Sequence, residues 1–254
     1  MSSSHTSFGK FVKHICVYAV FTMAVLVVAP FISSEKINMA NVMREMFSAG
    51  QWSIDTEIFV NIRLPRIILA FCAGAVLAVS GNIFQTILRN PLATPYTLGI
   101  ISGASTGAYL AIAFPALTFA AGILSTIQLF SLAGAFITMT LIYTMSKRSS
   151  GLSMNTLLLA GVTIGILCSS LTLMIRYLAN PAYLVSMDRW IMGGLGTFGY
   201  KSILSILLLI IPAIIVIASQ TIKLNHLAIN TELAISRGID VESVRKICFA
   251  GCSI

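Results

Sequence analysis

The sequence predicts an all-α protein, a polytopic bundle of transmembrane helices. Of the 254 residues, 57% are hydrophobic and only 9% are charged, whereas a soluble domain carries about 25% charged residues. Apolar runs of about 20 residues recur along the chain, and a helix of that length crosses a hydrocarbon core about 30 Å thick. Every Asp and Glu lies outside these runs. We therefore expect a multi-pass membrane protein in contact with lipid.

The apolar runs predict six complete spans and the start of a seventh. The expected helices cover residues 12–32, 64–88, 97–114, 120–145, 154–178 and 202–222. A polar segment, 33–61, follows the first helix, and an amphipathic stretch, LVSMDRWIMGGLG, precedes the sixth. From Arg245 the last run has about ten residues, or about 15 Å of helix, which is half a crossing. We expect a single transmembrane domain over residues 1–254 that is incomplete at its C-terminus.

The first apolar run is expected to be an uncleaved helix with Lys10 and Lys13 in the cytoplasm. It exceeds the 7–15-residue core of a signal peptide, and no small-x-small cleavage site closes it. This orientation puts nine basic residues in inner segments: Lys10, Lys13, Arg89, Lys147, Arg148, Lys223, Arg237, Arg245 and Lys246. It puts seven in outer segments: Lys36, Arg44, Arg63, Arg66, Arg176, Arg189 and Lys201. The excess of inner Lys and Arg agrees with the known bias of cytoplasmic loops.

Several function classes are excluded by the composition. The net charge of +8 comes from scattered residues, so a nucleic-acid partner is not expected. The five cysteines lie in or near apolar helices, which favours free buried thiols with no disulfide and no metal site. No Walker A, His-Glu-x-x-His or Cys-x-x-Cys pattern is found, so we expect no enzyme and no cofactor. The absence of an intramembrane acid argues against an ion-coupled carrier, although sodium sites made of backbone carbonyls stay open as an alternative. If cargo is pumped, the energy is expected to come from a partner.

Small and amide side chains recur within the expected spans. Three pairs are spaced four residues apart: Gly74 and Ala78, Gly103 and Gly107, and Gly161 and Gly165. Such spacing favours close packing of helix backbones. Asn82 and Gln85, near the end of the second expected helix, are predicted either to satisfy neighbouring backbone groups or to face a water-filled path.

Two arginines stand at the expected outer start of the second helix. Arg63 and Arg66 lie three residues apart on one side of it, and Pro65 is at a tolerated first-turn position. They are predicted either to anchor the helix at the interface or to dock acidic side chains of an external protein. The sequence alone leaves both interpretations open.

The stretch RNPLATPYTLG, 89–99, predicts a short rigid connection between the second and third helices. Asn90 and Thr94 each precede a proline, Pro91 and Pro95, which forces them out of the helical region. Irregular backbone of this kind is tolerated at membrane depth when protein buries it. We expect the turn, with Gly99 at its end, to lie inside the protein body.

The stretch ELAISRGIDVESVRK predicts two short helices on the cytoplasmic side. Residues 232–235 are expected to form the first, with Gly238 as its left-handed end. Asp240 is a fair N-cap for the second, with Ser243 at capping-box spacing but without the usual Glu. We expect this region, 224–242, to form a surface that another protein can hold.

Three blocks of sequence resemble one known family. The run RLPR…GAVLAVSGNIFQTILRNPLATPYTLGIISGA, together with WIMGGLG and LAISRGID, is similar to the permeases of bacterial type II ABC importers of ferric siderophores, haem and cobalamin. The resemblance runs from about residue 60 to the end. It implies a ten-helix permease that works as a dimer, with a second copy or a paralogue. It also implies two cytoplasmic ATPase subunits and a periplasmic substrate-binding protein.

The resemblance assigns roles to individual residues. Arg63 and Arg66 would dock the binding protein. The ATPase-coupling residues would be Glu232, Leu233, Ala234, Ser236, Arg237 and Gly238. The inner gate and path would involve Lys147, Ser153, Asn155, Gly161, Gly165, Asn82 and Gln85. The structural turn would be Asn90, Pro91, Pro95 and Gly99.

The family's second half, including a Gly-rich IGF-type block followed by Pro-His and Arg, is absent from the sequence. The leading expectation is the permease of a ferric siderophore importer in a bacterial inner membrane, with haem or cobalamin as alternative cargo. An ATP-independent channel or carrier half, and a non-functional truncated permease, are the alternatives.

Overall fold

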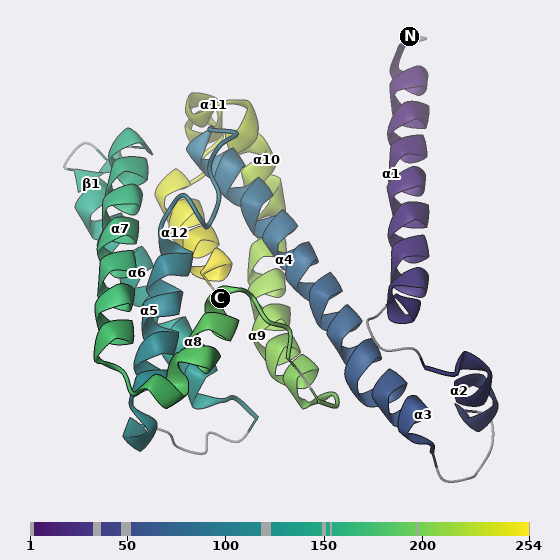
Figure 1. Cartoon of the computed structure of the whole chain (residues 1–254). Helices are drawn as coiled ribbons and strands as arrows, with labels where there is room; N and C mark the ends of the chain where they lie inside the picture. Colours follow the sequence, from purple (N-terminus) through teal and green to yellow (C-terminus); the bar gives the residue numbers. More distant parts are fainter. Residues whose placement is uncertain are drawn as a thin grey trace. The chain divides into compact units, whose positions relative to one another are not determined.

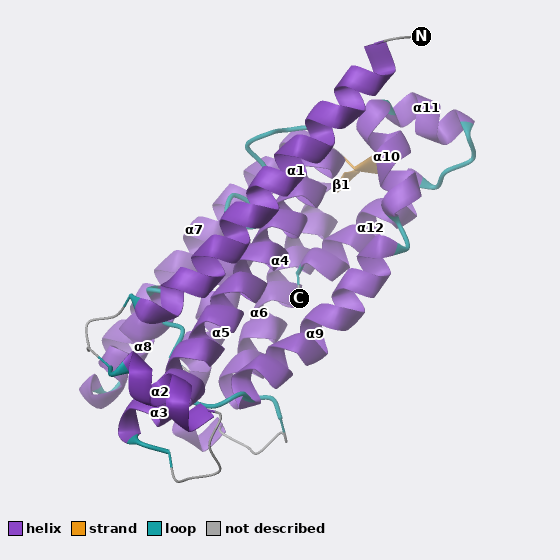
Figure 2. Cartoon of the chain, turned by 90° about the vertical axis from the view of Figure 1, so that its right-hand side faces the viewer, coloured by secondary structure: helices purple, strands orange, loops and turns teal. Residues whose placement is uncertain are grey.

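The chain forms helices over nearly all of its described length (Figure 1, Figure 2). The computed structural model describes residues 3–32, 37–46, 52–117, 123–148, 151–152, 154–196 and 198–253. It contains two compact units. Unit 1 comprises Met1–Phe71 and Leu195–Ile203, and unit 2 comprises Cys72–Gly194 and Leu204–Ile254.

The predicted all-α transmembrane fold is confirmed. The α-helices are α1 (Ser3–Val28), α2 (Met39–Met46), α3 (Ile54–Ile58), α4 (Leu64–Leu88), α5 (Ile100–Ala113), α6 (Thr126–Ser146), α7 (Met154–Leu178), α8 (Leu184–Ile191), α9 (Lys201–Ala218), α10 (Thr221–Ile229), α11 (Thr231–Ser236) and α12 (Val241–Cys252). Short 3-10 turns cover Ala29–Phe31, Pro115–Leu117 and Pro181–Tyr183, and a π-helical turn covers Phe59–Arg63. Strands β1 (Lys147–Arg148) and β2 (Gly151–Leu152) pair antiparallel between α6 and α7.

Five described helical stretches are long and apolar enough to cross a membrane. They are Gly9–Phe31, Ile54–Leu88, Thr126–Ser146, Asn155–Leu178 and Lys201–Ala218. The third expected span, 97–114, is only 14 residues of α-helix in the structure. Gly99 has φ of +68°, outside the helical region, so α5 starts at Ile100, and Pro115 begins a 3-10 turn after its end.

The second expected helix starts ten residues too late in the prediction. Helical structure begins at Ile54 and continues through the π-helical turn to Leu88, a run of 35 residues. The polar segment 33–61 therefore contains helix, since α2 and α3 fall within it. Hydropathy alone does not show this start, because polar and acidic residues are mixed with apolar ones over 53–61, SIDTEIFVN.

Other boundaries shift for local reasons. The first helix ends at Val28, before Pro30, instead of at 32. The fourth begins at Thr126 instead of 120, because Ser125 and Gln128 form a capping box: Ser125 Oγ accepts from the Gln128 amide and Gln128 Oε1 accepts from the Ser125 amide. The sixth stops at Ala218, and α10 follows separately. The second short helix and the seventh helix are one element, α12, which begins at Val241.

In unit 1, polar side chains tie the two short helices together. Glu45 near the end of α2 accepts hydrogen bonds from the Ser53 amide at 2.7 Å and from the Thr56 hydroxyl at 2.7 Å. Asp55 in α3 accepts from the Asn38 amide at 2.9 Å. The bonds that Glu45 accepts, led by the one from the Ser53 amide, lower the pKa of its carboxyl.

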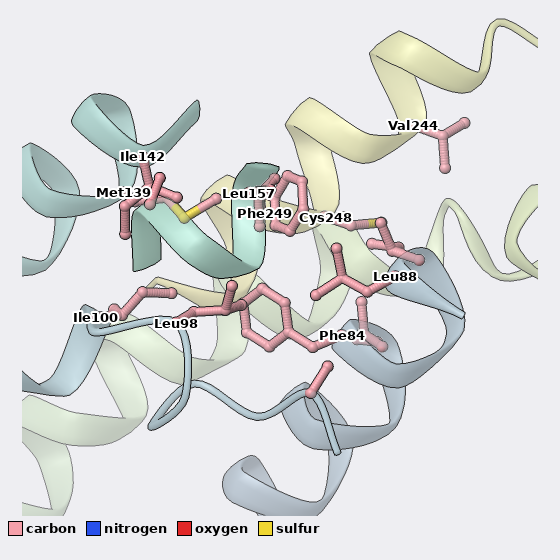
Figure 3. Packing of buried hydrophobic residues seen from close by; sticks show 14 of the residues in the cluster. Phe84, Leu88, Leu98, Ile100, Met139, Ile142, Leu157, Val244, Cys248 and Phe249 are labelled. Atoms are coloured by element: carbon pink, nitrogen blue, oxygen red, sulfur yellow. The ribbon is translucent and has the colours of Figure 1, made fainter. Parts of the chain in front are cut away.

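In unit 2, one hydrophobic core joins α4, α6, α7 and α12 (Figure 3). Phe84 of α4 and Phe249 of α12 are fully or almost fully buried, and their ring centres lie 5.6 Å apart. Tyr143 of α6 meets the same Phe249 ring edge-on at 6.4 Å. α12 is thereby packed between the end of α4 and the end of α6.

The α5–α6–α7 block packs through glycines, as predicted for the pairs Gly103–Gly107 and Gly161–Gly165. The prediction is wrong for Gly74 and Ala78 on α4, because a Cβ on Gly74 would meet no other described residue within 4 Å. A Cβ at Gly107 would overlap the Phe130 carbonyl, and one at Gly134 would overlap the Gly103 carbonyl. No side chain fits between these backbones. Backbones in this α5–α6–α7 block approach closely because lipid supplies no hydrophobic drive for association.

Candidate functional site

An irregular turn in the helical run Ile54–Leu88 leaves two carbonyl groups, both in unit 1, that accept hydrogen bonds from a distant segment of the same unit. Pro65 has no N–H to donate to the carbonyl four residues earlier, at Asn61. The Gly199 amide donates to that Asn61 oxygen at 2.7 Å, and the Tyr200 hydroxyl donates to the Val60 oxygen at 3.1 Å. The π-helical turn that precedes Pro65 is a local irregularity of the kind often found at functional positions.

Arg63 and Arg66 lie inside this run and not at its start, which corrects their expected position. Arg63 is 8% exposed, and its Nη1 donates to the Pro30 carbonyl at 2.9 Å. Arg66 is exposed, and its Nε donates to the Leu195 carbonyl at 3.2 Å. Arg63 therefore braces the end of the first helix, while only Arg66 of the two presents a cation at the surface of unit 1.

The turn between α4 and α5 in unit 2 is held by its own polar groups. Asn90 Oδ1 accepts from the Leu92 amide at 2.9 Å, and Pro91 follows Asn90 in a turn conformation. Thr94 and Thr97 exchange side-chain to backbone hydrogen bonds at 2.9 and 3.1 Å. Pro95 is buried. The connection is short and cross-braced.

The end of this turn contacts the glycines of α7. A Cβ at Gly99 would lie 2.6 Å from the Gly161 carbonyl oxygen and 2.9 Å from Gly165 Cα. Gly161 in turn faces Leu98. Both α7 glycines are buried against the turn, so in this structure they serve close packing and their expected path-lining role stays a prediction.

Asn82 and Gln85 lie on an exposed side of α4. Neither side chain hydrogen-bonds to another described residue of the chain. Gln85 contributes only its backbone carbonyl, which accepts from the Asn90 amide at 3.2 Å. The expected contact with a water-filled path stays a prediction for both amides.

The predicted coupling segment forms a compact helical turn in unit 2. Asn230 caps α11, its Oδ1 accepting from the Glu232 amide at 2.9 Å. Gly238 has φ of +74°, and the Ile239 amide donates back to the Ala234 carbonyl at 3.1 Å. Such a six-to-one bond with a left-handed glycine closes a helix C-terminus. Asp240 then caps α12.

α11 presents a mixed apolar and charged surface. Ala234 is fully buried and anchors the helix on the core. The other predicted coupling residues are not buried, namely Glu232, Leu233, Ser236, Arg237 and Gly238. Beside them, Ile229 and Ile235 are 68% and 60% exposed. Ile235 was expected in this short helix but not among the coupling residues, and Ile229 was not expected at the site. Exposed apolar side chains ringed by polar ones are typical of a protein-binding surface.

The hairpin between α6 and α7 meets α12 through one carboxylate. Lys147 Nζ lies 3.1 Å from Glu242 Oε1, and Lys246 Nζ lies 3.2 Å from the same oxygen. The Tyr143 hydroxyl donates to it at 3.3 Å. We call these four residues the inner cluster. Glu242 was not expected at the site, because an ion pair between residues 95 positions apart leaves no local pattern in the sequence.

The remaining predicted gate residues are less informative. Asn155 is exposed at the start of α7. Ser153 lies outside the described residues. Arg89, at the end of α4, donates from Nη2 to the Ile229 carbonyl at 2.8 Å and so joins α4 to α10.

Two carboxyl groups at the start of α12, those of Asp240 and Glu242, have lowered pKa values. The hydrogen bond from Lys147 is the largest cause that lowers the pKa of Glu242, followed by that from Lys246. The hydroxyl and amide of Ser243 lower the pKa of Asp240. No group of three or more potential metal ligands is found among the described residues. The start of α12 thus holds its two carboxylates in the charged form.

Comparison with known proteins identifies the relatives of the chain. The FecCD transport family matches residues 21–254. The hemin transport system permease HmuU of Yersinia pestis is 33% identical over 230 residues, covering 89% of this chain and 67% of that protein. The vitamin B12 import permease BtuC of Escherichia coli is 33% identical over 210 residues, covering 81% of this chain and 62% of that protein.

Two further matches agree with these. An iron chelatin transport system permease of Helicobacter pylori is 31% identical over 214 residues, covering 84% of this chain and 63% of that protein. A solved inward-facing structure of a metal-chelate type ABC transporter matches with a TM-score of 0.75 and 25% identity, covering 95% of this chain and 73% of that one. The chain thus spans between 62% and 67% of the length of these curated relatives.

Proposed function

The chain belongs to the FecCD transport family, and we propose that it is the membrane-spanning permease of an ATP-binding-cassette importer. ATP would be hydrolysed by separate cytoplasmic subunits, and a second permease copy or a paralogue would complete the path. The observation that carries the proposal is the exposed surface of α11, a short capped helix set on the core of unit 2 at the end predicted to face the cytoplasm. The proposed location is a bacterial inner membrane.

The ATPase is proposed to hold α11. This helix is anchored from below by the buried Ala234 and is closed at both ends by Asn230 and Gly238, so it can transmit a push as a unit. Its outer face offers the apolar Leu233 and Ile235 beside charged neighbours. A groove in a soluble partner can bury the former and pair with the latter.

Co-purification tests this role. The tagged chain, expressed with the genes beside its own, should retain a protein that carries a Walker A motif. Ile235→Glu should abolish retention, because it puts a charge into an apolar contact. Val185→Glu, at a comparably exposed position on α8, should leave retention intact. Equal retention by both variants would rule out α11 as the contact.

The periplasmic binding protein is proposed to dock on unit 1 through Arg66. Its guanidinium is exposed, and its hydrogen bond to the Leu195 carbonyl fixes the side chain in one orientation. Charged rims of this kind set encounter rate and register more than affinity. Arg63 is assigned a supporting part, because it is buried and braces Pro30.

Arg66→Glu should remove the stimulation of ATP hydrolysis by the loaded binding protein and keep the basal rate. Arg44→Glu, an exposed cation on α2 of the same unit, is the matched control and should keep the stimulation. If Arg66→Glu is stimulated like the wild type, Arg66 is no docking residue.

The cargo is proposed to be a metal chelate, with a ferric siderophore as the first candidate and haem and cobalamin as the others. The relatives that are named for hemin, vitamin B12 and iron chelatin support the class and leave the member open. Competition of radioactive iron siderophore uptake by unlabelled haem or cobalamin in reconstituted vesicles would identify the cargo. Uptake of none of the three would exclude this class.

A further inference from the structure

Three donors from two parts of unit 2 share one oxygen atom in the inner cluster. Glu242 Oε1 lies 3.1 Å from Lys147 Nζ, 3.2 Å from Lys246 Nζ and 3.3 Å from the Tyr143 hydroxyl. Tyr143 and Lys147 belong to the end of α6 and the first strand of the hairpin, whereas Lys246 belongs to the same helix as Glu242. The carboxylate of Glu242 therefore has two partners on other elements, Tyr143 and Lys147, and one partner, Lys246, on its own helix.

Glu242 follows the proposed coupling helix, α11, by only a few residues in the sequence. Asp240 caps α12 with its side chain, accepting from the Glu242 and Ser243 amides at 3.1 Å. Four residues before Glu242, Gly238 ends α11, and the Ile239 amide reaches back to the Ala234 carbonyl. Two hydrogen-bonded residues, Ile239 and Asp240, thus connect α11 to the first turn of α12, where Glu242 lies.

We propose that Glu242 is a positioning residue that ties the hairpin after α6 to the coupling helix α11, through an ion pair with Lys147 that opens and closes as α11 moves. The use of this ion pair in transport rests on the proposed function, but the ion pair itself does not. The carboxylate orients Lys147, and Lys147 carries the hairpin. No substrate contact is assigned to either residue.

The chemistry suits a contact that must break at low cost. The Lys147 and Glu242 side chains are 51% and 42% exposed, and exposed pairs contribute little to stability. A lysine ammonium also bonds without the fixed two-pronged geometry of arginine. When Lys147 departs, Lys246 still neutralises the carboxylate, so neither state leaves an unpaired anion.

The first test measures the hairpin position without any partner. Nitroxides are placed at Arg148→Cys and Ala250→Cys in the full chain, with the native cysteines replaced by alanine, in lipid nanodiscs. Pulsed electron resonance should show a broader distance distribution in Lys147→Gln and in Glu242→Gln than in the parent. Lys246→Gln is the matched control, since it removes a partner of the same oxygen within one helix, and should keep the parent distribution.

The second test separates positioning from mere stability. In vesicles that hold the chain with its ATPase, Lys147→Gln and Glu242→Gln should lower cargo transported per ATP by about fivefold, the lower range of allosteric coupling. Protein yield and melting midpoint should stay unchanged. The exchanged pair Lys147→Glu with Glu242→Lys should restore much of the ratio, because the opposite charges are again side by side.

The outcomes separate the two proposals. If distances broaden but no cargo is transported by the wild type, the ion pair stands and the proposed function fails. If the wild type transports cargo but Lys147→Gln and Glu242→Gln both match it in distance and ratio, the positioning role is overturned. Broadening in Lys246→Gln equal to that in Lys147→Gln would also overturn it, because the effect would then be a loss of charge and not of a link.

Discussion

The α5–α6–α7 block and the inner cluster are both in unit 2, yet they are held by opposite kinds of contact. In the block, backbones touch through Gly103, Gly107 and Gly134, and an added methyl group would overlap a carbonyl or a side chain. In the inner cluster, half-exposed side chains meet at one carboxylate oxygen. Backbones in direct contact cannot move relative to each other without a clash, whereas an ion pair between long exposed side chains can break and form again. The comparison indicates which part of the unit stays fixed and which part can move.

The largest expected effect is a loss of stability when a glycine of the α5–α6–α7 block is replaced. Gly107→Ala should destabilise the chain by about 1–3 kcal/mol, the cost of overpacking a close interface, because the new Cβ meets the Phe130 carbonyl. Gly81→Ala is the matched control, since a Cβ there has open space within 4 Å. It should be neutral or more stable by up to about 1 kcal/mol from helix propensity. Denaturant unfolding in micelles measures both, and equal stability of the two variants would contradict the packing argument.

The glycine contacts were predictable from the sequence, and the charged contacts were not. Four-residue spacing of small residues along a chain indicates close helix packing, and the pairs Gly103–Gly107 and Gly161–Gly165 are buried as that spacing suggests. Long apolar runs likewise predicted where the long helices lie, but only the expected helix 154–178 has both of its limits in the structure, since the one at 64–88 continues from a helical run that begins at Ile54. The observed helix limits differ from the expected ones near Pro30, Gly99 and the Ser125 capping box. Each of these is a local signal, and the expected limits were set by hydropathy instead.

In the candidate site, too, features that act on neighbours in the chain were predictable and long-range contacts were not. The left-handed Gly238 and the Asp240 cap were predictable because they act on neighbours in the chain. The burial of Arg63 and the role of Glu242 depend on Pro30 and Lys147, 33 and 95 positions away. Long-range pairs of this kind leave no periodic trace, so a single sequence does not reveal them.

A smaller loss of stability is expected from breaking the ion pair between α7, the last helix of the α5–α6–α7 block, and α8. Arg176 of α7 and Asp188 of α8 form a two-pronged pair, with Nη2 and Oδ2 at 3.1 Å. Both side chains are 38% exposed, so Arg176→Gln should cost about 1 kcal/mol or less of stability. It should also raise hydrogen exchange in residues 184–191, since α8 loses its link to α7.

Arg189→Gln serves as the control for this pair. Arg189 is an exposed neighbour of Asp188 in the same helix and has no ion pair among the described residues. It should leave the exchange of α8 unchanged. If both arginine variants raised hydrogen exchange equally, the effect would reflect a general loss of charge near α8. The Arg176–Asp188 ion pair would then not be the contact that holds α8 to α7.

The smallest expected effect is the pH response of the inner cluster near neutrality. Lys147 and Lys246 lower the pKa of Glu242 below its ordinary value of 4.5. A lowered carboxyl pKa contributes stability that is present above the unfolded value and lost as pH falls through the folded one. The titratable groups that face this carboxylate are Tyr143, Lys147 and Lys246. The distance between labels at 148 and 250 should therefore stay narrow from about pH 8 to about pH 5.5 and broaden only below about pH 4.5.

Glu242→Gln is the control for this pH response. It has no proton to gain and should give one distance distribution throughout the same pH range. A wild-type distribution that broadened near neutrality would point to a different titrating group, and the carboxylate would no longer explain the link between the hairpin and α12.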